Sequence, residues 1–233
     1  METLISKHHF LKQYFDYAGW DYQKEVTLIE NGRLDQNHPL RIIRTEGKLV
    51  IEYMPGFSNF DATLLSSNIS NQEIVASILG TNVSFLEKQS FIMFAPKAIT
   101  LPPIEGFSIE PLTLHQKIDL GRLKSACSNQ ELESSLVGLE DDDTLGIYHN
   151  RDLLAAGSLW FLGDKLADIH LITHPKFRSI GFGKLLIGLL INRSFRFNRI
   201  PIARGELQNE ATYKVAITTG FIEAISIFEI EVD

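Results

Sequence analysis

Hydrophobic and polar positions along the first hundred residues predict a mixed α/β segment. Aromatic side chains gather on one face of residues 8–18, which predicts a short helix. From Ser70 to Leu86 apolar side chains recur at roughly helical spacing, although Gly80 interrupts the pattern. Runs of strand-forming residues bounded by turn residues predict strands at 25–30, 40–44, 48–54 and 90–95.

Beyond residue 105 the pattern alternates more regularly between strands and helices. A strand at 107–111 precedes a helix that Thr113 caps and that runs to Cys127, and a second helix ends at Gly138. Gly220 follows a later helix, at a position where a positive φ favours glycine. The other predicted elements are strands at 144–149, 153–161, 166–173, 200–207 and 221–232, a glycine-bearing loop followed by an apolar helix from 175 to about 197, and a helix at 209–219. This order predicts a mixed α/β fold.

Two adjacent prolines, Pro102 and Pro103, mark the clearest break in the chain. They supply no backbone donors and fix an extended path, so their segment belongs in neither a helix nor a central strand. We therefore predict a smaller N-terminal α/β domain of unknown role at residues 1–104 and a second domain at residues 105–233.

Composition narrows the classes of function. The chain has 233 residues, and its 44% of hydrophobic residues is ordinary for a folded protein. Its 22 Lys and Arg against 29 Asp and Glu give a net charge of −7, which argues against a nucleic-acid partner. One cysteine, Cys127, excludes a disulfide framework, and the histidines lack metal-ligand spacing. No apolar run is long enough to span a membrane and no secretory signal is evident, so we expect a cytoplasmic protein.

The segment from 168 to 186 carries the most informative pattern, because a strand leads into a short loop that opens a helix. Backbone N–H groups between Arg178 and Lys184 would then be free at the positive end of a helix, where anions bind. Gly181 and Gly183 would let a phosphate approach the backbone closely. The arginine and the lysine add positive charge. We expect a diphosphate ligand; the alternative is that the two glycines only form a tight turn.

Two common phosphate-binding motifs do not fit this segment. The P-loop pattern lacks its first glycine upstream of Gly183, and Leu185 stands where a hydroxyl is required. The dinucleotide-binding pattern requires a third glycine where the chain has Leu186.

The segment instead resembles the pyrophosphate loop of the GNAT acyltransferase superfamily, [QR]-x-x-G-x-[GA], which stands here as R-S-I-G-F-G from Arg178 to Gly183. A second match begins at Asn209 and ends at Gly220-Phe221, similar to the family's N-x-x-[AS]…G-F helix, with Thr212 in place of the small residue. The resemblance covers residues 106–233, and both motifs occur in the family's order and at its separation.

The resemblance implies a mixed sheet in which two central parallel strands splay apart and admit acetyl-CoA as a co-substrate. Asn209 would bind the pantetheine arm or the thioester end; it also suits a helix cap, and the two roles are compatible. The pantetheine arm would run along the strand at Leu171, Ile172 and Thr173. The pyrophosphate would lie on the loop formed by Arg178, Ser179, Ile180, Gly181, Phe182, Gly183 and Lys184.

The implied reaction is direct acyl transfer to an amine, which must lose a proton before it attacks. The family's general-acid tyrosine is replaced by Ala216, and Tyr213, three residues earlier, is the candidate substitute; it suits a packing role equally well. Asp168 and His170 alternate onto one face of their strand and are the candidate bases. The alternative is that this face simply meets solvent or the N-terminal domain.

We therefore expect an N-acetyltransferase that acts on a small-molecule or peptide amine and needs no metal. The N-terminal part would shape or cover the acceptor site or mediate homodimer formation. Ala216 motivates the alternative of a non-catalytic CoA-binding regulatory module. The acidic run at residues 140–143 would attract a cationic acceptor or form a solvated loop.

Overall fold

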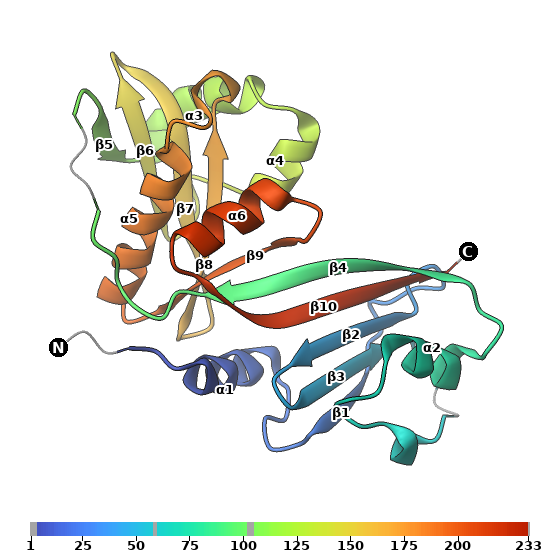
Figure 1. Ribbon diagram of the computed structural model, residues 1–233. Coiled ribbons are helices and arrows are strands. Elements are labelled where there is room, and N and C mark those ends of the chain that lie inside the picture. Colours follow the sequence, from blue (N-terminus) through green and yellow to red (C-terminus); the bar gives the residue numbers. More distant parts are fainter. Residues whose placement is uncertain (1–3, 58–59, 102–104, 233) are drawn as a thin grey trace. The chain divides into compact units, whose positions relative to one another are not determined.

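The computed structural model describes residues 4–57, 60–101 and 105–232, which pack into two compact units (Figure 1). The first unit contains the described residues up to Phe10 together with Met93–Gly205 and Asn209–Ile222. The second contains Leu11–Ile92, Glu206–Gln208 and the chain from Glu223 onward. These units do not coincide with the predicted domains. The predicted boundary at residues 102–104 lies outside the described residues and stays a prediction.

The first unit is a mixed sheet of five strands in the order β5-β6-β7-β8-β9. The first four strands pair antiparallel, and β8 pairs with β9 in parallel. The strands are β5 (Ser108–Pro111), β6 (Asp143–His149), β7 (Asp152–Leu162), β8 (Leu166–Thr173) and β9 (Ile200–Glu206).

Helices cover both faces of this sheet. Leu120 and Leu123 of α3 (Lys117–Ser125) pack with Ala156 and Ile172 of the sheet in one buried cluster, and α4 (Asn129–Ser135) contacts β8. The long helix α5 (Phe182–Arg196) packs on β7 and β8 and against α6 (Glu210–Thr218). Because side chains alternate along a strand, the even-numbered residues of β8 share the face of Ile172. Two 3-10 turns, η2 (Leu114–Gln116) and η3 (Pro175–Phe177), complete the unit.

Residues 99–101 are hydrogen-bonded to α5 and pack on it. The Asn192 side chain donates to the Ile99 carbonyl and accepts from its N–H, both at 2.9 Å. A Cβ added at Gly188 would lie 2.7 Å from the end of the Ile99 side chain and 2.4 Å from that of Leu101. This segment therefore lies directly on the helix and belongs to the same packed unit.

The second unit is a sheet in the order β1-β3-β2-β10-β4, whose last strand ends in the first unit. A capping box of Ser70 and Glu73 starts its helix α2 (Asn71–Leu79), and apolar side chains of that helix share a core with β2, β3 and β10. The remaining elements are α1 (Lys7–Ala18), β1 (Val26–Glu30), β2 (Leu40–Thr45), β3 (Lys48–Tyr53), η1 (Ala62–Leu64), β4 (Phe85–Phe94) and β10 (Ile222–Val232).

Most predicted elements are confirmed within a few residues, with one correction. The helical pattern after Ser70 ends at Leu79, and residues 85–89 begin β4 instead of continuing a helix. The loop predicted between the strand and the helix is present, because Gly181 adopts φ 105° and α5 begins at Phe182. Gly220 has the expected positive φ of 90°. In the described ranges, no helix is both long and apolar enough to cross a membrane.

Candidate functional site

The loop between β8 and α5 is exposed and built from two left-handed residues. Ser179 has φ 64° and Gly181 has φ 105°, and Gly181 is the N-terminal cap residue that directly precedes α5. No side chain caps this helix end. A Cβ built on Gly181 or on Gly183 would meet nothing within 4 Å. The two glycines therefore border open space and do not lie under neighbouring side chains.

Backbone donors at the start of α5 point out of the helix end. The first helical hydrogen bond is made by the Leu185 N–H to the Gly181 carbonyl at 3.0 Å. The N–H groups of Phe182, Gly183 and Lys184 precede that bond, so they have no acceptor within the helix. Together with the helix dipole, these three donors suit an anion.

The side chains of the predicted loop residues lie in different environments. Phe182 is buried, and its ring meets that of Phe107 edge-on at 4.9 Å, so only its backbone is available to a ligand. Ile180 and Lys184 are exposed.

Arg178 is already engaged. Its guanidinium forms an ion pair with Glu131 of α4, and its Nε donates to the Thr173 carbonyl at 3.2 Å. The Arg178 hydrogen bond is the main cause that lowers the pKa of Glu131 to about 2. The Cys127 thiol lies 3.9 Å from the guanidinium, and partial burial raises its pKa, which does not favour a nucleophilic thiolate.

The two parallel strands of this unit pair over three residues only. The register joins Leu166 to Ile200, Ala167 to Pro201 and Asp168 to Ile202, and it goes no further. On its other side, β8 stays paired with β7 as far as Thr173. The backbone of β8 from Ile169 to Thr173 is thus unpaired toward β9, which is the predicted splay (Figure 1). Leu171, Ile172 and Thr173 lie in this stretch, directly before the glycine loop.

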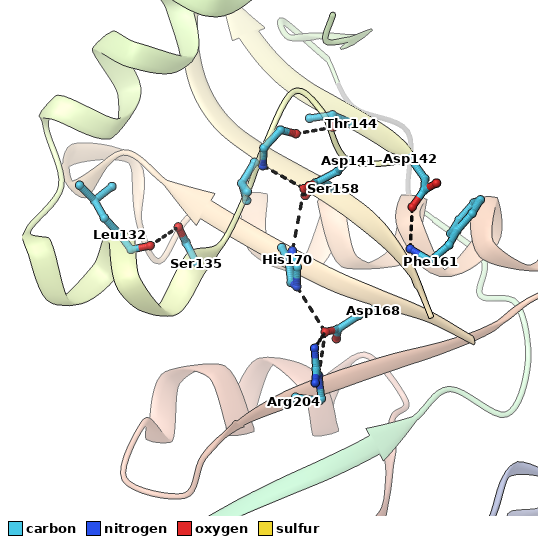
Figure 2. A network of polar contacts seen from close by, with 12 residues as sticks. Leu132, Ser135, Asp141, Asp142, Thr144, Ser158, Phe161, Asp168, His170 and Arg204 are labelled. Atoms are coloured by element: carbon cyan, nitrogen blue, oxygen red, sulfur yellow. Dashed lines mark hydrogen bonds and ion pairs between the residues drawn. The ribbon is translucent and has the colours of Figure 1, made fainter. Parts of the chain in front are cut away.

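Asp168 and His170 lie where the strands part, and the structure brings them together. The His170 Nε2 is 3.3 Å from Oδ2 of Asp168, which also accepts two hydrogen bonds from the Arg204 guanidinium, one of them at 2.7 Å from Nε (Figure 2). The Asp168 side chain is only 2% exposed and that of His170 12%. Among the described residues, Oδ1 of Asp168 and Nδ1 of His170 have no hydrogen-bond partner. This face of β8 therefore does not simply meet solvent.

The acidic run is solvated only in part: Glu140 and Asp142 are exposed, whereas Asp141 and Asp143 are partly buried. Asp141 accepts from the Gly138 N–H at 2.9 Å and from the Ser158 hydroxyl, and its carboxylate lies near His170 (Figure 2). Asp142 accepts from the Phe161 N–H at 2.7 Å, and Asp143 forms an ion pair with Arg193 of α5.

The second motif occupies the start of α6. The Asn209 side chain caps this helix by accepting from the Thr212 N–H at 3.2 Å, as the cap interpretation predicts. Ala216 is buried, whereas Tyr213 is partly exposed one turn earlier on the helix. These positions leave open both the packing and the catalytic interpretation of Tyr213.

Comparisons with known proteins identify the fold. No protein-family model matches the chain, and no curated protein matches it. Among solved structures, an acetyltransferase from the GNAT family of Colwellia psychrerythraea matches 69% of this chain and 62% of its own, with a TM-score of 0.54 and 20% identity. The chain has a GNAT-like fold. A GCN5-related N-acetyltransferase from Kribbella flavida matches 68% of this chain and 63% of its own, at a TM-score of 0.48 and 9% identity. The matched part thus spans under two thirds of either protein.

Several residues of the candidate site were not identified from the sequence. Glu131 engages Arg178 from another helix. Ser158 stands opposite His170 in the strand register, and its hydroxyl donates to Asp141, which lies near the ring. One feature of the sequence points to Arg204, because this charged residue directly follows the apolar run 200–203 of β9. The described residues contain no group of three or more His, Cys, Asp or Glu side chains suited to a metal ion.

Proposed function

We propose that this protein is an N-acyltransferase that transfers an acyl group from a CoA thioester to an amine. The proposed donor is acetyl-CoA. The observation that carries the proposal is the unpaired stretch of β8 that leads directly into an open glycine loop. Unpaired strand backbone offers donors and acceptors to the amides of a pantetheine arm, as an added strand would. The uncapped end of α5 offers donors to a diphosphate at the far end of the same ligand.

Different residues would bind different parts of this ligand. Leu171, Ile172 and Thr173 would contact the pantetheine arm through their backbone, with Asn209 near the arm or its thioester end. The diphosphate would take the N–H groups between Ser179 and Lys184. Arg178 would turn from Glu131 toward the phosphates, because a diphosphate offers this guanidinium more negative charge than one carboxylate does.

The buried carboxylate at the strand divergence supports an amine acceptor. Oδ1 of Asp168 has no donor in the part of the chain that the structure describes, and an ammonium group supplies one. Asp168, with His170 behind it, would take the proton that the ammonium must lose before it attacks the thioester carbonyl. The amine then gives up a second proton as the C–S bond breaks, and the departing thiolate gains one to become the CoA thiol. Tyr213 is the candidate donor for that last step.

The acceptor is proposed to be a small molecule or a peptide amine, and the cytoplasm is the proposed location. The alternative function, a CoA-binding regulatory module without catalysis, is favoured by one observation, the buried Ala216 in place of the usual tyrosine. Both functions predict CoA binding.

Two measurements test the proposal. Calorimetry with CoA tests the site, and the absence of affinity at millimolar concentration would reject both functions. Thiol release from acetyl-CoA against a panel of amines separates them: acyl transfer to any amine supports the enzyme, whereas tight CoA binding without transfer to any acceptor supports the regulatory module.

A further inference from the structure

His170 lies between two carboxylates in the first unit (Figure 2). Its Nε2 is 3.3 Å from Oδ2 of Asp168, and its Nδ1 is 3.9 Å from Oδ2 of Asp141. The carboxylate side chains are 2% and 7% exposed. Because little water reaches these groups, the charge of each carboxylate acts on the ring with little screening.

Asp141 is held in place against the ring. Its Oδ2 accepts from the Gly138 N–H at 2.9 Å and from the Ser158 hydroxyl. Ser158 is fully buried on β7 and stands opposite His170 in the register of β7 and β8. The carboxylate is therefore fixed by the sheet itself and does not belong to a mobile acidic loop.

Two carboxylates stabilise a ring that carries two protons more than Asp168 alone would, which makes the neutral ring a better proton acceptor. A neutral imidazole has one N–H, so either tautomer turns a bare nitrogen toward a carboxylate oxygen. With a proton on both nitrogens, each carboxylate faces a donor. The Arg204 guanidinium already balances the charge of Asp168, and the charged ring then balances Asp141.

We infer that Asp141 is a positioning residue that stabilises the doubly protonated ring of His170. The chemical use of this ring rests on the proposed function. Asp168 takes the proton that the acceptor's ammonium group gives up and becomes neutral. It passes the proton to His170, which restores the carboxylate and leaves a positively charged ring beside Asp141. His170 returns to neutral when the proton leaves to solvent.

The neighbouring acidic residues provide a matched comparison. In the described part of the chain, the charged groups facing the ring are Asp168 from β8, Asp141 from the segment before β6 and, through Asp168, Arg204 from β9. Asp142, the next residue, accepts from the Phe161 N–H and does not face the ring. Changing Asp142 removes the same charge from the same segment.

The test is an NMR titration of the His170 ring, whose signals are assigned by their loss in His170→Gln. In Asp141→Asn the ring should lose its second proton at a lower pH than in the parent protein, because the charge that stabilises the doubly protonated ring is gone. Asparagine keeps an oxygen for Gly138 and Ser158, so the local structure is retained. Asp142→Asn should titrate like the parent. An unchanged titration in folded Asp141→Asn would overturn the inference.

Two further measurements cover the case in which that variant does not fold. Asp141→Glu keeps the charge, so its ring should behave more like that of the parent protein than that of a variant without the carboxylate. In the parent protein at low pH, both ring N–H protons should appear as separate low-field signals protected from exchange; their absence would also overturn the inference. These readouts need no CoA. If CoA does not bind, the proposed function fails while the titration still decides the role of Asp141.

Discussion

Arg178 and Glu131 form an ion pair that joins the start of the glycine loop to α4. The same guanidinium also donates to the Thr173 carbonyl at the end of β8. The residue expected to meet a phosphate is therefore held by a carboxylate and a carbonyl from its own unit. This geometry predicts that ligand binding at the loop competes with the ion pair.

Glu131→Gln is expected to tighten CoA binding by about two- to fivefold, because it frees the Arg178 guanidinium while exposed ion pairs are worth little. Glutamine keeps the oxygen that accepts from the Ser128 N–H and hydroxyl, so the helix cap persists. Calorimetry measures the affinity. The control is Glu133→Gln on the same helix, and equal affinities in both variants would show that the ion pair does not compete.

Gly181→Glu is expected to weaken CoA binding about tenfold or more, because it places bulk and negative charge at the phosphate position. Any side chain at φ 105° also strains the backbone. Gly47→Glu is the matched control, since this turn glycine of the second unit has φ 66° and open space around it. CoA affinity equal to that of the control would contradict the loop assignment.

Tyr213→Phe is expected to slow acyl transfer by about a hundredfold if the hydroxyl protonates the thiolate, with unchanged CoA affinity. The measurement is turnover at saturating acetyl-CoA beside a calorimetric binding constant. An unaltered rate in a variant that binds CoA normally would assign Tyr213 to packing and leave the proton donor elsewhere.

The environment of Tyr148 predicts that the stability of the folded protein depends on pH in the alkaline range. Burial and the neighbouring Asp119, to which its hydroxyl donates at 3.3 Å, raise the pKa of Tyr148 to about 12. A raised pKa in the folded state contributes stability that is complete below the unfolded value near 10 and is lost as the pH rises through about 12. Ultraviolet titration should therefore show one tyrosine ionising near pH 12. Tyr148→Phe should remove that step, and a tyrosine spectrum fully titrated by pH 11 would contradict the assignment.

Local sequence signals predicted the elements that carry the glycine loop. Apolar strand residues up to Thr173, the proline after His174 and the glycines at 181 and 183 mark strand, turn and helix start within one short segment. The parting of β8 and β9 was expected from the family resemblance and is present in the register.

Long-range contacts account for what the sequence did not predict. Leu86 continues the helical apolar spacing that begins after Ser70 but lies in a strand, because strand partners distant in sequence override local propensity. Asp141 looked like one member of an acidic run, and its carboxylate comes near His170 because it accepts from Ser158, which stands opposite His170 in the register of β7 and β8. No local pattern indicates such a pairing.

The attachment of Ile99 to Asn192 has a practical consequence for dissecting the protein. A fragment that begins at residue 105 would lack residues 99–101, which pack on α5. The helix surface around Gly188 would then be exposed to water, and the amide of Asn192 would lose its two backbone partners. The fragment would also lack the residues up to Phe10, although Ile5 donates to the Pro96 carbonyl at 2.7 Å. The first unit therefore cannot be produced whole as one contiguous fragment. A fragment that keeps the contact with Asn192 must begin near Met93, and the first ten residues must be supplied as a separate peptide.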